Sequence, residues 1–121
     1  MVPGPRHELT AAWVDAHGHC TIHVLHPRPG TVLVRVAGEI DLGTARKLDE
    51  VLQSRVGPEA DEVVVDLGAV TFFSVAGLNS LLRARLLADT AGARLTIDAE
   101  RSRAVRRLFA LLPAESLSPA R

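Results

Sequence analysis

The sequence contains few aromatic residues and only one cysteine. Among its 121 residues are no tyrosine, one tryptophan and three phenylalanines. The single cysteine, Cys20, excludes an intramolecular disulfide. The 14 basic and 14 acidic side chains cancel, so no overall field draws the chain toward nucleic acid, an anionic membrane or a highly charged substrate. A partner would therefore be selected by local shape and local charge.

Long hydrophobic runs are also absent. No stretch approaches the roughly 20 apolar residues that a membrane-spanning helix requires. The chain does not open with a basic segment followed by an apolar one, so we expect a cytoplasmic protein without membrane insertion. Apolar residues nevertheless make up 47% of the sequence, and most of them are Leu, Val and Ala. This length and composition predict one domain with an aliphatic core.

The first part of the chain shows no sustained periodicity. Residues 1–18 therefore predict a loosely ordered N-terminal arm, with at most one short strand at Ala11–Val14. We place the folded domain at residues 19–113 and a C-terminal tail at residues 114–121.

Alternating apolar residues predict a hairpin at the start of the domain. The two strands are Cys20–Val24 and Thr31–Ala37, and Pro27–Gly30 breaks the alternation between them. A short turn between two strands implies antiparallel pairing.

A helix and a buried strand are predicted next. Thr44 is a candidate N-cap for a helix that ends at Gly57-Pro58. The unbroken apolar run Val63–Val65, within Glu62–Leu67, is typical of a central strand covered on both faces. Because a helix separates this strand from the hairpin, the connection should be a crossover and the pairing parallel.

The remaining elements repeat this alternation of helix and strand. A loop at Gly68–Phe73 precedes a helix that starts at its N-cap Ser74 and ends near Gly92. A strand at Ala93–Ile97 and a helix through Val105–Leu112 follow. The order β-β-α-β-α-β-α predicts an α/β fold: a mixed sheet of four to five strands packed against helices.

Two segments resemble a known family. They are Val36–Ala45 and the stretch that runs from Val63–Leu67 through Val70–Phe73 to Ala76–Leu78. Together they resemble the STAS domain, and the matching element order extends over about 20–112. The family comprises bacterial anti-sigma factor antagonists, some lipid-transport accessory subunits and the cytoplasmic tails of sulfate transporters. The resemblance implies a STAS-like single domain.

The family's phosphorylation site differs here. In antagonists of this family, a serine after an aspartate at the start of the second helix is phosphorylated by a partner kinase, in the pattern Phe-hydrophobic-Asp-Ser-x-Gly-Leu. Aligning Phe72, Gly77 and Leu78 with that pattern puts Ser74 at the aspartate and Val75 at the phospho-acceptor. Since valine cannot accept phosphate, the usual charge switch is missing at that position. Ser74 is a candidate phosphorylation site, although capping alone is favoured.

The resemblance implies a module for protein-protein interaction in transcription regulation by partner switching. We expect it to bind a kinase-like anti-sigma factor and to free a sigma factor, without phosphorylation at the usual position. The alternative is an accessory subunit of a transporter ATPase or a larger signalling complex, and a homodimer is left open. The expected partner-binding residues are Asp41, Leu42, Gly43, Thr44, Phe72, Phe73, Ser74, Val75, Ala76, Gly77 and Asn79.

Adjacent aromatic residues in this set cannot share one environment. Because Phe72 and Phe73 point in different directions, we expect one in the core and the other exposed as an anchor for a partner.

Three further patterns favour ordinary structural roles. His17, His19, Cys20, His23 and His26 include zinc-ligand types, but His19 and His23 stand about 13 Å apart along a strand, so we predict no metal. Ser74 lacks the glycines of Gly-x-Ser-x-Gly, which argues against an enzyme. The sequence also contains no glycine-rich phosphate loop, and we predict no cofactor. The arginines of the last helix predict a solvated face rather than a nucleic-acid site; they are Arg101, Arg103, Arg106 and Arg107.

Overall fold

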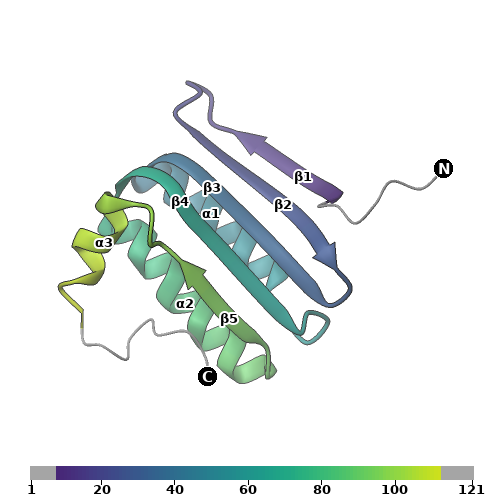
Figure 1. The fold of residues 1–121 in the computed structure, drawn as a ribbon. Helices are drawn as coiled ribbons and strands as arrows, with labels where there is room; N and C mark the ends of the chain where they lie inside the picture. Colours follow the sequence, from purple (N-terminus) through teal and green to yellow (C-terminus); the bar gives the residue numbers. More distant parts are fainter. Residues whose placement is uncertain (1–7, 113–121) are drawn as a thin grey trace.

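The computed structural model describes residues 8–112, which form one mixed sheet and three helices (Figure 1). In chain order the elements are β1 (Glu8–Val14), β2 (Cys20–Arg28), β3 (Thr31–Ile40), α1 (Leu42–Arg55), β4 (Glu62–Phe73), α2 (Val75–Ala91), β5 (Arg94–Asp98) and α3 (Arg103–Phe109). The strands lie in the order β1-β2-β3-β4-β5. β1, β2 and β3 pair antiparallel, whereas β3, β4 and β5 pair parallel. The predicted α/β fold with a mixed sheet is therefore confirmed.

The core lies between the sheet and two helices. α1 and α2 lie side by side across one face of the sheet, and α3 packs against β4 (Figure 1). Fully buried side chains from strands and helices meet there; the largest include Val34, Val36, Val63, Val65, Leu48, Leu52 and Leu81. Burying each such side chain contributes about 1.5–3 kcal/mol, so this aliphatic layer supplies most of the driving force for folding.

The strand expected at Ala11–Val14 is present and longer than predicted. β1 pairs with β2 from Glu8↔His26 to Val14↔Thr21, and Trp13 packs against the core. Residues 8–14 thus form an edge strand of the sheet and are not part of a loose arm. The rest of the expected arm, residues 1–7, and the expected tail at 114–121 lie outside the described residues.

The prediction of a loop at residues 68–73 is wrong, because β4 continues to Phe73. Its second half pairs with the end of β3, from Ala37↔Ala69 to Ile40↔Phe73. Two irregularities in this register interrupt the alternation by which a strand is recognised in a sequence. β4 is also not the central strand, since β3 takes the middle position and β4 lies between β3 and β5. Val64 is only partly buried, so the expected burial on both faces is incomplete.

The start of α1 differs from the prediction by one turn. The N-cap is Asp41, not Thr44, and Thr44 occupies the third helical position. The Thr44 backbone N–H donates to Asp41 Oδ1 at 2.9 Å, and the Asp41 N–H donates to Thr44 Oγ1 at 2.9 Å. Both residue types are good caps, and this reciprocal capping box decides which one starts the helix. The predicted cap Ser74 and the helix end at Gly92, with φ of 76°, are confirmed.

Candidate docking surface at the helix starts

Parallel pairing brings the starts of α1 and α2 together. Ile40 at the end of β3 is paired with Phe73 at the end of β4. A capping residue follows each strand, Asp41 in one case and Ser74 in the other. The Ser74 backbone N–H donates to the Ile40 carbonyl at 2.9 Å. The two first helical residues, Leu42 and Val75, therefore belong to neighbouring helix starts at the same end of the sheet.

Large apolar side chains are exposed at this end. Leu42 is 74% exposed, Val75 is 61% exposed and Phe72 is 51% exposed. We call these three residues the helix-start surface. The three residues belong to three separate elements, α1, β4 and α2, that meet at one end of the sheet. Apolar residues exposed close together mark an interaction site more often than isolated ones do. Their arrangement can bury apolar area against a partner protein.

A shallow groove between α1 and α2 begins at the helix-start surface. Its volume is about 190 Å³, and its lining includes Leu42 and Ala76. Arg83 of α2 and Asp49 of α1 form an ion pair across the helices, with Nε and Oδ1 2.9 Å apart. The sequence prediction did not include these charged residues, because nothing in their spacing shows that the two helices are neighbours. The surface is thus apolar at the helix starts and charged along the groove.

Several of the expected contact residues are buried beneath the helix-start surface. Phe73 is only 7% exposed and Thr44 only 4%, so the expectation of one core and one exposed phenylalanine is confirmed. Gly77 is buried too, and a Cβ there would lie 2.8 Å from both Ile40 Cγ2 and Phe73 Cε1. Thr44, Phe73 and Gly77 were expected to bind a partner, but their side-chain positions offer it little or no area.

The other expected contact residues lie at or near the surface. Asp41, Gly43 and Asn79 are exposed, while Ser74 and Ala76 are partly buried. Hydrogen bonds from the Thr44 backbone and hydroxyl hold the pKa of Asp41 below its ordinary value. A carboxylate at this place also complements the positive end of α1. Asp41 therefore acts as a structural anion at the edge of the surface.

Ser74 is held as a helix cap. Its Oγ accepts a hydrogen bond from the Gly77 backbone N–H at 3.2 Å. Among the hydrogen bonds of residues 8–112, none joins Ser74 to a histidine. This arrangement satisfies a free N–H in the first turn of α2 and is the one expected of an N-cap serine.

The cysteine and the neighbouring histidines occupy different environments. Cys20 is 1% exposed, and burial, with smaller contributions from the charges of Asp15 and Asp41, raises the pKa of its thiol to about 11. His17 and His19 are exposed. Within the described range 8–112, no three His, Cys, Asp or Glu residues are grouped to hold a metal ion. The thiol stays protonated at neutral pH and is a poor ligand or nucleophile.

None of the helices in the described part of the chain has the length and apolar character needed to cross a membrane.

The arginines in and just before α3 differ in their contacts. Arg101 Nη2 lies 3.6 Å from Asp66 Oδ1, and Arg35 Nε lies 3.5 Å from Asp66 Oδ2. Arg101 is therefore engaged within the domain, whereas Arg103, Arg106 and Arg107 are exposed.

Comparison with solved structures shows similar folds in anti-sigma factor antagonists. An antagonist from Mycobacterium paratuberculosis is 28% identical, with a TM-score of 0.68 over 82% of this chain and 81% of that one. Unphosphorylated SpoIIAA is 15% identical, with a TM-score of 0.63 over 74% of this chain and 77% of that one. The phosphorylated form of SpoIIAA, a Bacillus cell fate determinant, is 14% identical, with a TM-score of 0.64 over 80% and 87% of the two chains.

The sequence itself matches one family description. A search of curated proteins found no match. Residues 25–118 match the family described as "Mlab, STAS domain", and this match spans more than half of the chain. The chain therefore belongs to the STAS domain family.

Proposed function

We propose that this protein is an anti-sigma factor antagonist, which binds a kinase-like anti-sigma factor and so frees a sigma factor. The observation that carries the proposal is that Leu42, Phe72 and Val75 are all more than half exposed at the same end of the sheet. The similarity to the Mycobacterium paratuberculosis antagonist, at 28% identity, supports the same role.

Binding at the helix-start surface would be driven by apolar burial. Covering a fully exposed Val, Leu or Phe side chain is worth about 1.5–3 kcal/mol, so three such residues can supply the centre of an interface. The Asp49–Arg83 pair in the adjoining groove is partly exposed. Charges in such a position adjust orientation and association rate more than affinity.

Control by phosphate would differ from that of the family pattern. Phosphorylation adds a charge of about −1.5 to −2, which would oppose docking on an apolar surface. Val75 has no hydroxyl to carry that group, and it is 61% exposed at the position where it would contact a partner. We propose that binding is constitutive, with Ser74 acting as a cap.

A second function has one specific observation in its favour. The family that matches residues 25–118 carries the description "Mlab, STAS domain". Since the STAS family includes lipid-transport accessory subunits, the same helix-start surface could instead dock on a transporter ATPase. Both functions use protein docking and differ in the identity of the partner.

A pull-down from cells that produce the protein distinguishes the two. Wild-type protein, Val75→Glu and the control Leu86→Glu serve as baits; Leu86 is 66% exposed on α2, three turns beyond Val75. We expect a kinase-like anti-sigma factor with the wild type and the control, and its loss with Val75→Glu. Recovery of a transporter ATPase in its place would establish the second function. Mass spectrometry of the bait should find Ser74 unmodified, and a phosphate there would overturn constitutive binding.

A further inference from the structure

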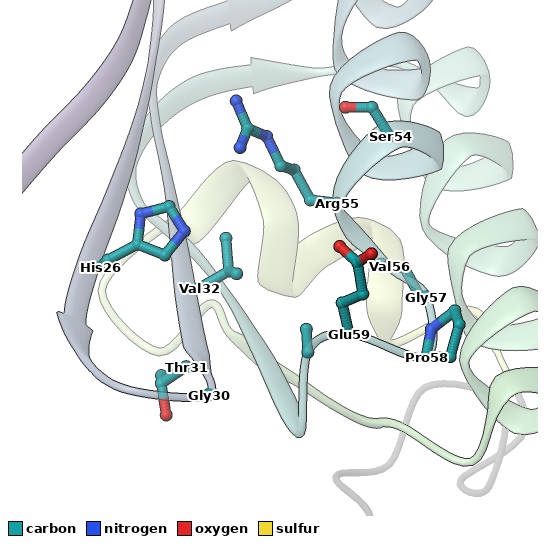
Figure 2. Close-up of a pocket in the computed structure, with 11 residues that line it drawn as sticks. His26, Gly30, Thr31, Val32, Ser54, Arg55, Val56, Gly57, Pro58 and Glu59 are labelled. Carbon is teal, nitrogen blue, oxygen red and sulfur yellow. The ribbon is translucent and has the colours of Figure 1, made fainter.

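A second hollow lies at the opposite end of the sheet from the helix-start surface. It has a volume of about 410 Å³ and lies between the β2–β3 hairpin and the segment that follows α1 (Figure 2). α1 connects the two places, because it begins at the cap Asp41 and ends at Arg55, which lines this cavity. A ligand here would leave Leu42, Phe72 and Val75 uncovered.

The cavity combines apolar and polar side chains. Val32, Val56 and Ala60 line it and are each at most 7% exposed, so they provide a fixed apolar base. His26 and Arg55 come from different sides, and both are partly buried. Small-molecule sites have this composition, with an apolar lining and a few converging polar groups, and volumes of about 300–1,000 Å³.

Arg55 supplies the positive charge of the cavity. Figure 2 shows its side chain extending from α1 into the space between the helix and the hairpin. The ion pairs recorded among residues 8–112 do not use Arg55 or Glu59. A guanidinium offers five donors in a fork that matches a carboxylate. Arg55 can therefore hold a carboxylate of a ligand.

His26 presents an acceptor when its ring is neutral. The Thr10 hydroxyl donates to the Val24 carbonyl at 3.1 Å and also lies 3.2 Å from His26 Nδ1. In the neutral tautomer whose Nδ1–H donates to Thr10 Oγ1 while the Thr10 hydroxyl donates to Val24, the lone pair lies on Nε2. The ring is turned so that this second nitrogen faces the cavity (Figure 2).

Negative groups accompany the neutral imidazole. Glu59, an exposed residue, lines the same cavity. Ser54 and Arg55 do so as well, and they are the last residues of α1. The final carbonyl groups of a helix lack partners within the helix and carry the negative end of its dipole. This part of the cavity therefore favours a cationic donor such as an ammonium group.

We propose that this cavity binds a small α-amino acid with an aliphatic side chain. Arg55 holds the carboxylate, while His26 Nε2 and Glu59 face the ammonium group. The side chain lies against Val32, Val56 and Ala60. The proposal does not depend on the docking function, because the two sites share no residue.

Titrations followed by NMR of the backbone amides test this. The ligands are leucine, 4-methylpentanoate, which lacks the ammonium group, and 3-methylbutylamine, which lacks the carboxylate. We expect leucine to shift the amides of residues 26, 32, 54–57, 59 and 60 and to bind at least about 10-fold more tightly than either analogue, because charged hydrogen bonds are worth about 1.5–3 kcal/mol. Absence of shifts with leucine at about 10 mM, or equal binding of 4-methylpentanoate, would overturn the proposal.

Variants assign the two charged groups. Arg55→Gln should weaken leucine binding by about 10- to 100-fold. Glu59→Gln should weaken leucine binding and leave any weak binding of 4-methylpentanoate unchanged. Arg107→Gln removes an exposed charge from α3 and serves as the control. Urea unfolding of each variant checks that it is folded, and equal leucine affinity in wild type and Arg55→Gln contradicts the assignment.

Discussion

Alanine substitution at two glycines in the first turns of α1 and α2 should change stability in opposite directions. At Gly43, an added Cβ would lie 3.6 Å from Asp41 Oδ1, which is ordinary contact. Replacing this glycine reduces the entropy of the unfolded chain and should stabilise the fold by about 0.5–1 kcal/mol. At Gly77, the Cβ would lie 2.8 Å from Ile40 Cγ2 and from Phe73 Cε1.

The clash should outweigh the entropic gain at Gly77. Carbon atoms pack best at about 3.5–4.0 Å, so a carbon at 2.8 Å must displace its neighbours. Ile40 is 0% exposed and Phe73 is 7% exposed, so neither can move without disturbing the core. Overpacking of this kind costs about 1–3 kcal/mol. Because the Cβ meets two buried carbon atoms at 2.8 Å, the cost should fall in the upper half of this range, about 2–3 kcal/mol. Subtracting the gain in helix propensity of about 1 kcal/mol leaves an expected loss of about 1–2 kcal/mol for Gly77→Ala.

Urea and thermal unfolding followed by circular dichroism measure both effects. With about 4 °C of Tm for each kcal/mol in a domain of this size, Gly43→Ala should raise Tm by about 2–4 °C and Gly77→Ala should lower it by about 4–8 °C. A Gly77→Ala variant as stable as the wild type, or shifts of the same sign in both variants, would refute the packing argument.

Three further changes test the cap, the cysteine and the core. Asp41→Ala should lower the free energy of unfolding in urea by about 1 kcal/mol. Hydrogen bonds from Thr44 lower the folded-state pKa of Asp41, so its stabilising contribution is present above the unfolded pKa of about 3.9 and is lost as pH falls. The difference in stability between wild type and Asp41→Ala should therefore disappear in acid. A difference that widens in acid would contradict this sign. Cys20, with a pKa of about 11, should react with iodoacetamide in urea but not in the native state, and equal rates would contradict its burial. Leu52→Ala, at a site 0% exposed, should cost about 2–5 kcal/mol, whereas Leu86→Ala should change stability by less than about 0.5 kcal/mol.

Local patterns predicted most of the fold. The alternation at Cys20–Val24 and Thr31–Ala37 predicted the hairpin, because one face of each strand is buried against helices. Ser74 was predicted as a cap from the type of its side chain and its place before an apolar helix. In each case the sequence pattern that carries the prediction lies within a few consecutive residues.

Features that depend on distant partners were not predicted. The end of β4 is a strand because it pairs with Ala37–Ile40, and its register irregularities hide the alternation. The choice between Phe72 and Phe73 for the core depends on the pairing of Phe73 with Ile40 and on its edge contact with the Phe109 ring, 6.5 Å away. The Arg55 cavity likewise needs β2, β3 and the end of α1 together. Only the assembled fold brings these groups into contact.

The most direct test of the account is the affinity of the anti-sigma partner for three forms of the protein. Calorimetric titration of the purified partner should give Kd for the wild type, Val75→Glu and Leu86→Glu. Burial of the helix-start surface predicts that Leu86→Glu binds like the wild type and that Val75→Glu binds about 30-fold or more weakly, which corresponds to a loss of about 2 kcal/mol. Unchanged affinity of Val75→Glu, or equal weakening in both variants, would contradict docking at the helix starts.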